Sequence, residues 1–242
     1  MPSPDLRSTS PAHAGEVKAS REPVVLVHGL WMIGHEFSVL RHRLQARHGY
    51  DVHVFSYPSL HGDAAEIGAE LAEFTRRRAA GAERAHVVGH SLGGAIAYRA
   101  LEQGLRDVPG HTVVMAAPLS GCRAAHGATQ FSMLRSLLGP HVLHELAEGC
   151  ERCWPADAPR KLGAIAGTRR LGIGQFFAHF DEDNDGTVAV SETLIPGLAD
   201  HLVLPHSHIG MLFANDVADQ VAHFLRHGCF DHAKKGGAEA PR

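Results

Sequence analysis

The sequence predicts an α/β fold, in which about six mostly parallel strands form a sheet with helices on both faces. Short continuous apolar runs rich in valine are typical of strands that are buried on both sides, as in a parallel sheet. Segments with apolar residues at helical spacing lie between these runs and supply the crossovers. No repeat at a solenoid period is visible, so a layered sheet is favoured over a repeat architecture.

The first half of the chain alternates strands and helices. A strand is expected at 24–27, and a helix at 36–47, where Phe37, Leu40 and Leu44 recur at helical spacing. A strand at 52–56 and a helix at 64–78 follow. A third strand, at 84–88, precedes a helix of small residues at 94–101. That helix is expected to end near Gly104, because glycine commonly terminates helices.

The second half adds strands at 112–116, 162–166 and 201–204 and a closing helix at 214–226. The segment 118–160 is too long for a simple crossover. Its apolar residues recur at roughly helical spacing, interrupted by Gly139-Pro140: Phe131, Leu134, Leu137, Leu138, Val142, Leu143 and Leu146. This pattern predicts either a crossover helix packed on the sheet or a small helical cap over a functional site.

Length and composition predict one folded domain at 23–232. A chain of 242 residues with 44% hydrophobic content can form one sizeable core. Residues 1–22 are rich in Pro, Ser and Ala, and residues 233–242 are mostly polar and small, so both are expected to be flexible tails.

Charge and hydropathy exclude some partners and locations. The net charge of -3 gives no reason to expect nucleic acid as a partner. No apolar run is long enough to span a bilayer, and residues 1–10 lack the pattern of a secretory signal, so a cytoplasmic location is expected. The four cysteines do not form the dense pattern of a disulfide scaffold and are expected to be free thiols.

The segment Gly89-His90-Ser91-Leu92-Gly93 matches the Gly-x-Ser-x-Gly pattern, and it lies between an expected strand and an expected helix. This context is typical of a nucleophile elbow, a tight turn that presents a serine at a strained backbone angle. Small residues must flank the serine, because larger side chains would collide with the neighbouring backbone. The pattern predicts that Ser91 is a nucleophile.

A serine hydroxyl needs a base to remove its proton and a carboxylate to orient that base. After the expected strand at 201–204, the chain offers His206 and His208. An acidic loop further upstream offers Asp181, Asp183 and Asp185. The residues alone leave the choice within each set open.

A resemblance narrows both choices. The segment from His208 to Phe213 is similar to the histidine loop of the small bacterial lipases of the α/β-hydrolase superfamily, the minimal type without a large lid. The resemblance covers roughly residues 23–227. It implies that His208 is the base, with His206 as the alternative. It also implies the chain order nucleophile, acid, histidine, which points to Asp185 in Asp-Gly-Thr-Val, with Asp183 and Asp181 as fallbacks.

The same resemblance implies an oxyanion hole and an acyl pocket. The strand at 24–27 ends in a His-Gly turn, after which Leu30 supplies one backbone amide, and Leu92, directly after the nucleophile, supplies the other. Trp31, Met32 and Tyr57 lie on loops after neighbouring strands. These three side chains either line the acyl pocket or pack in the core.

Two metal sites compete with this interpretation. Residues of the acidic loop fit the positions of an EF-hand calcium loop: Asp181, Asp183, Asp185, Gly186, Val188 and Glu192. Pro196-Gly197 would stop the exiting helix and no second loop exists, which leaves a looser Ca²⁺ site of Asp181 and Asp183, or a solvated acidic loop. The ligand types of His141, His144, Cys150 and Cys153 are compatible with zinc, but a single Cys-x-x-Cys with two helical histidines is a weak signal, and a surface helix with incidental thiols is favoured.

The sequence therefore predicts a serine hydrolase that cleaves small-molecule or lipid carboxylic esters through an acyl-enzyme and requires no cofactor. An acyltransferase, a thioesterase or a perhydrolase would use the same triad. A calcium-binding or scaffold protein that kept the fold without catalysis is the alternative of another class.

Overall fold

The computed structural model describes residues 21–60, 62–128, 145–146, 153–155, 157–176 and 179–234. Within these ranges, six strands form one parallel sheet in the order β2-β1-β3-β4-β5-β6. The strands are β1 (Pro23–Val27), β2 (Asp51–Phe55), β3 (His86–His90), β4 (Thr112–Met115), β5 (Leu162–Gly167) and β6 (Asp200–Leu204). The predicted fold class is confirmed, and all neighbouring strands are parallel. Because they are parallel, the loops that follow them gather at one edge of the sheet.

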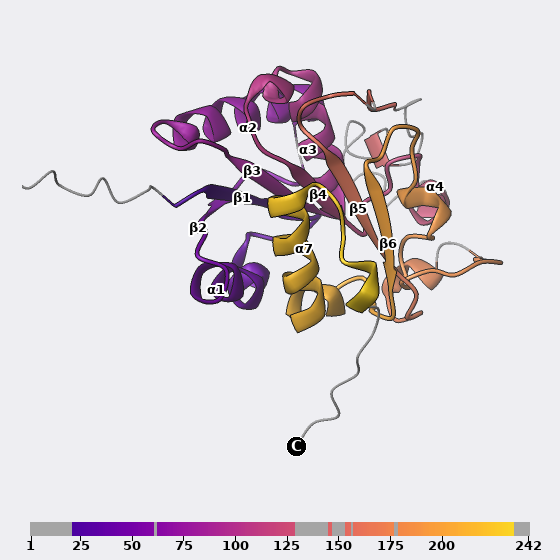
Figure 1. Ribbon diagram of the computed structural model, residues 1–242. Helices are drawn as coiled ribbons and strands as arrows, with labels where there is room; N and C mark the ends of the chain where they lie inside the picture. The colour runs from indigo at the N-terminus through magenta and orange to yellow at the C-terminus, as the bar shows by residue number, and fades with distance from the viewer. Residues whose placement is uncertain are drawn as a thin grey trace, which may run out of the picture.

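Helices cover both faces of this sheet (Figure 1). Helices α2 (Ala64–Ala79) and α3 (Leu92–Glu102) lie on one face, and α1 (Ser38–Ala46) and α7 (Asn215–His227) lie on the other. A shorter helix, α4 (Arg123–Ala128), follows β4. Short 3-10 turns include η1 (His35–Phe37) and η5 (Gly210–Phe213).

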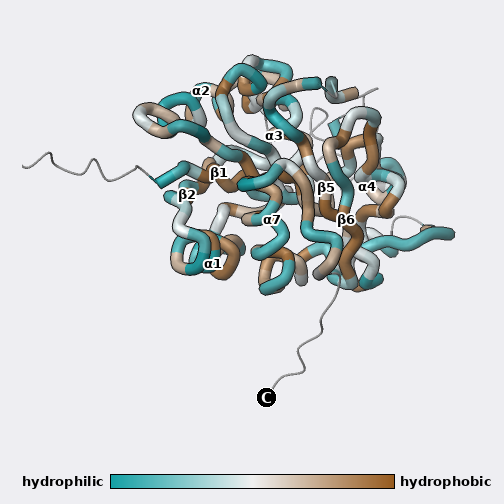
Figure 2. The backbone as a smooth tube through the Cα atoms, in the orientation of Figure 1, coloured by the Kyte–Doolittle hydropathy of each residue, from teal (hydrophilic) through white to brown (hydrophobic). Residues whose placement is uncertain are grey.

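Strand β1 shows why the buried strands could be predicted from their apolar residues. Its side chains alternate between two separate cores: Val25 and Val27 pack toward α2 and α3, whereas Val24 and Leu26 pack toward α1 and α7. Successive side chains of a strand point to opposite faces, so a strand covered on both sides must be apolar at every position. The apolar segments of the strands accordingly lie in the middle of the molecule (Figure 2).

The predicted boundaries around Ser91 were wrong by two residues. The strand expected at 84–88 is β3, His86–His90, and the helix after it begins at Leu92 rather than at 94. Gly89 and His90 are poor strand formers, yet Gly89 pairs with Val27 of β1 and His90 pairs with Met115 of β4. Pairing on both sides therefore overrode local propensity and carried the strand up to Ser91.

Some expectations fall outside the described residues. Of the apolar residues expected to form helices in 118–160, Leu146 is described and lies in the core, and the others are outside the described ranges. Residues 1–20 and 235–242 of the expected tails are outside as well. Among the helices that the structure describes, none has both the length and the apolar character that crossing a membrane requires.

Candidate active site

Ser91 occupies the turn between β3 and α3 with a φ of 55°, in the left-handed region that residues other than glycine rarely adopt. Such strain persists only where the surrounding structure enforces it. The two flanking glycines of the pattern make the turn feasible. A Cβ atom on Gly89 would lie 2.4 Å from the carbonyl oxygen of Gly93, and one on Gly93 would lie 2.1 Å from the carbonyl oxygen of Val27. The elbow predicted from the sequence is therefore present.

Replacing Gly93 with alanine should destabilise the fold by about 3 kcal/mol or more, because the added carbon collides with rigid strand backbone. Gly49→Ala is a useful control, because an added Cβ there meets no atom within 4 Å and the cost comes only from the positive φ of Gly49, which Gly93 does not share. The control should lose only about 1 kcal/mol. Urea unfolding of both variants measures the difference, and equal losses would contradict a steric role for Gly93.

A chain of hydrogen bonds joins Ser91 to two residues that are distant in the sequence. His208 Nε2 lies 3.1 Å from Ser91 Oγ, and His208 Nδ1 lies 2.8 Å from Asp185 Oδ2. A carboxylate only accepts hydrogen bonds, so Nδ1 carries the proton and Nε2 accepts the serine hydroxyl. Asp185 is fully buried and His208 is nearly so. The arrangement has the geometry of a nucleophile, a base and an orienting acid.

The loop around Asp185 holds this carboxylate rigidly. Its second oxygen, Oδ1, accepts hydrogen bonds from the amides of Thr187 and Val188 at 2.9 and 2.8 Å. The backbone carbonyl of Asp185 also accepts a hydrogen bond from the amide of His208 at 3.0 Å. The acid loop and the histidine loop are thus joined through backbone as well as side chains.

The alternative residues lie elsewhere. His206 pairs with Asp216 at the start of α7, at 2.9 Å, rather than with Ser91. Asp181 is exposed and lies 3.1 Å from His179, and Asp183 is exposed too. Neither of these aspartates is hydrogen-bonded to His208, so the geometry favours Asp185.

His90 is a residue that the sequence pattern did not mark. It is the fully buried last residue of β3, and its Nε2 donates a hydrogen bond to the backbone carbonyl of His208 at 2.8 Å. Burial lowers the pKa of His90 to about 3, so its ring is neutral beside His208 near neutral pH. The pattern Gly-x-Ser-x-Gly leaves this position open, so no sequence signal identified it.

The two residues expected to supply oxyanion-hole amides lie in segments next to Ser91. Leu92 is the first residue of α3, and the amides of the first helical turn have no acceptor within the helix. On the other side, a Cβ atom on Gly29 would lie 3.2 Å from Ser91 Cβ, so the loop after β1 passes directly beside the serine. Leu30 follows Gly29 in this loop.

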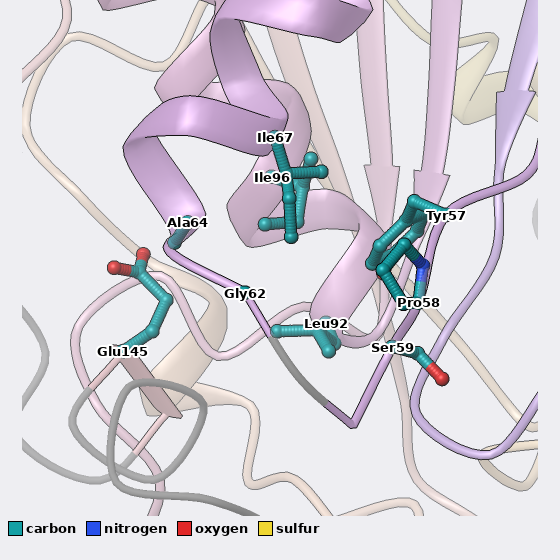
Figure 3. A pocket seen from close by; sticks show the side chains of 9 residues that line it. All are labelled: Tyr57, Pro58, Ser59, Gly62, Ala64, Ile67, Leu92, Ile96 and Glu145. Carbon is teal, nitrogen blue, oxygen red and sulfur yellow. The ribbon is translucent and has the colours of Figure 1, made fainter.

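The three residues expected to line an acyl pocket differ in position. Tyr57 is buried and lines a pocket together with Leu92, Ile67 and Ile96 (Figure 3). With a volume of about 10 Å³, this pocket has room for about one water molecule. Trp31 is 47% exposed, and Met32 packs against the core between the sheet and helices α1 and α7.

The acidic loop uses its carboxylates in other ways than an EF-hand would. Glu192 is buried and accepts hydrogen bonds from the side chain and the amide of Arg123 at 2.9 and 2.8 Å, while Asp185 is paired with His208. In the part of the chain that the structure describes, no three His, Cys, Asp or Glu side chains are grouped as metal ligands. Three of the residues weighed for zinc, His141, His144 and Cys150, are outside that part; Cys153 is an exposed free thiol.

Comparisons with known proteins show which proteins share this fold. No curated protein matches the sequence. Among solved structures, the chain is similar to the mature form of a lipase from Bacillus licheniformis, with 20% identity, a TM-score of 0.66 and coverage of 85% of this chain and 91% of that chain. It is similar to a thermophilic esterase from Thermogutta terrifontis, with 12% identity, a TM-score of 0.60 and coverage of 86% and 90%.

A third similar structure is a phospholipase from Legionella pneumophila, with 17% identity, a TM-score of 0.63 and coverage of 85% of this chain. This chain covers only 57% of that longer protein. At such identities these likenesses show a shared fold. A model of the alpha/beta hydrolase family matches residues 24–229, which is most of the chain. The resemblance read from the histidine loop is thereby confirmed, and the chain belongs to the alpha/beta hydrolase family.

Proposed function

We propose that this protein is a serine hydrolase of carboxylic esters. The observation that carries the proposal is the hydrogen-bonded series from Ser91 through His208 to Asp185, with distances of 3.1 and 2.8 Å. A serine hydroxyl is a weak nucleophile until a neighbouring base removes its proton. The names of the similar structures, a lipase, an esterase and a phospholipase, support an ester as the substrate.

In the proposed mechanism, Ser91 Oγ attacks the carbonyl carbon of the ester while His208 Nε2 takes its proton. The tetrahedral oxyanion accepts hydrogen bonds from the amides of Leu30 and Leu92. His208 then gives the proton to the departing alcohol, which leaves an acyl group on Ser91. Water, deprotonated by His208, releases the acid. Asp185 stabilises the imidazolium that forms in each half of the cycle.

The test combines a covalent probe with substrates. We expect a fluorophosphonate to react with the protein at Ser91, as mapped by mass spectrometry of the tryptic peptide. We also expect turnover of p-nitrophenyl esters, measured from acetate to palmitate, which gives the preferred acyl length. A protein that takes no label and hydrolyses no ester of the series would contradict the proposal.

Three related activities would use the same triad with a different substrate or a different acyl acceptor. A thioesterase, an acyltransferase or a perhydrolase uses the same three residues and differs in which ester bond breaks or which molecule attacks the acyl-enzyme. Adding a thioester, an alcohol or hydrogen peroxide to the same assay distinguishes these activities. Labelling of Ser91 together with faster turnover of the thioester, or faster turnover when the alcohol or hydrogen peroxide is added, would identify which of the three activities the protein has. Labelling without any turnover would leave the hydrolase proposal without support.

A further inference from the structure

His28, the residue directly after β1, makes two hydrogen bonds that define its protonation state. Its Nδ1 lies 3.0 Å from the carbonyl oxygen of Gly29, and its Nε2 accepts a hydrogen bond from the amide of Tyr57 at 3.3 Å. A carbonyl oxygen can only accept, so Nδ1 carries a proton, and Nε2 must offer its lone pair to Tyr57. The fully buried imidazole is therefore neutral and confined to one tautomer.

The bond to Gly29 controls the direction of the next amide. In a trans peptide the carbonyl and the N–H point in opposite directions, so the Gly29 carbonyl and the Leu30 N–H form one rigid unit. When the ring of His28 holds that carbonyl on one side, the Leu30 amide is directed to the other. The amide of Met32 also donates to the Gly29 carbonyl, at 3.3 Å. This peptide is thus restrained by two donors.

Tyr57, after β2, holds His28 from the opposite side. The two rings stack with centroids 4.4 Å apart and planes 15° from parallel, and the Tyr57 hydroxyl donates to the backbone carbonyl of His28 at 2.7 Å. Trp31, which follows Leu30 in the loop after β1, has a φ of 59°, and its amide donates a hydrogen bond to Ser59 Oγ at 3.2 Å. Strained backbone held by several contacts is a feature of preorganised sites.

We propose that His28 is a positioning residue for catalysis, which together with Tyr57 sets the Gly29–Leu30 peptide so that the Leu30 amide faces the oxyanion. This inference rests on the proposed ester hydrolysis and extends it. Tyr57 then acts on the oxyanion hole through His28, in addition to lining the small pocket beside Leu92. A misdirected amide stabilises the transition state less but leaves substrate binding intact, so the effect falls on kcat rather than KM.

The experiment compares substitutions that keep or remove individual hydrogen bonds. His28→Leu removes both ring nitrogens and should lower kcat by about 100-fold, the usual effect of losing one oxyanion donor. His28→Asn places an amide nitrogen where Nδ1 stands, so it can still donate to Gly29 and should recover about 10-fold of this loss. KM should change little in either variant.

A pair of tyrosine variants separates positioning from stability. Tyr57→Phe should lower kcat by about 10-fold, because the His28 carbonyl is released. Tyr50→Phe is the matched control: Tyr50 is also buried and donates to a backbone carbonyl, that of Ala222 at 3.4 Å, but on the other face of the sheet. It should keep its kcat even if its unfolding midpoint falls as much as that of Tyr57→Phe. If His28→Leu does not fold, the comparison of Tyr57→Phe with Tyr50→Phe still tests the positioning role.

Two results would overturn the inference. The first is a kcat that stays within about 3-fold of the native value in Tyr57→Phe and, where it folds, in His28→Leu. The second is a crystal structure of unliganded His28→Leu in which the Gly29–Leu30 peptide keeps its orientation. The second measurement needs no activity, so it still judges the positioning role if the native protein hydrolyses no ester and the proposed function fails.

Discussion

Ser91→Ala should lower kcat for ester hydrolysis by about 10⁵-fold to 10⁶-fold, since no other group can form the acyl-enzyme. The variant should fold, because alanine and serine have similar backbone requirements at a φ of 55° and the strain is unchanged. The amides at Leu30 and Leu92 remain, which should leave a small residual rate and a KM close to the native value. Initial rates with the preferred p-nitrophenyl ester, together with thermal unfolding, measure both effects.

Ser38→Ala is the control for this experiment, because Ser38 is an exposed residue at the start of α1 and should be neutral. Fluorophosphonate labelling should disappear in Ser91→Ala and persist in Ser38→Ala. Turnover by Ser91→Ala at more than about one hundredth of the native rate would show that another nucleophile operates and would refute the proposed mechanism.

Asp185→Asn should lower kcat by about 10⁴-fold at neutral pH, the effect that the same change has in other Ser-His-Asp triads. The hydrogen bonds of the loop explain why. Oδ1 accepts from the amides of Thr187 and Val188, so the carbonyl oxygen of asparagine must stay there and its NH₂ group must face His208. An NH₂ group donates to Nδ1, which moves the imidazole proton to Nε2. In that tautomer His208 cannot accept the proton of Ser91.

Asp181→Asn is the matched control for the same loop. Asp181 is exposed and contacts His179, so its charge is not needed at His208, and the variant should keep native kcat. Both variants and the native protein are assayed with added calcium and with a chelator. The native protein should be equally active in the two conditions. Equal losses in the two variants that calcium reverses would favour a metal-binding role for residues 181–192 over the triad.

The sequence predicted those parts of the site that depend on local backbone geometry. The turn at Ser91 requires small residues on both sides, and the pattern around Ser91 displays them. The choice of His208 over His206 rested on resemblance, because both histidines follow the same strand. The structure distinguishes them through partners: His208 meets Asp185 and Ser91, whereas His206 meets Asp216.

The sequence did not predict the roles of residues that act through contacts between distant segments. His90 and His28 were predicted only as parts of motifs, yet their rings hold the carbonyls of His208 and Gly29. Tyr57 was expected either to line an acyl pocket or to pack in the core; it lines a small pocket, and its hydroxyl also donates to the backbone carbonyl of His28, directly after β1. Each of these roles depends on which atom a ring nitrogen or hydroxyl faces, and a sequence pattern does not specify this.

The sequence by itself determined the parallel sheet, the serine in its tight turn after β3 and the order of the elements. Strands buried on two faces and a serine in a tight turn impose their own residue choices within a few positions of the chain. Tertiary structure alone decided that Ser91, Asp185 and His208 meet, and how the peptide before Leu30 is turned. The physical reason is that hydrogen bonds act over about 3 Å and depend on direction. Residues more than 100 positions apart, such as Ser91 and His208, reach that range only after the sheet has brought the ends of β3 and β6 to one edge.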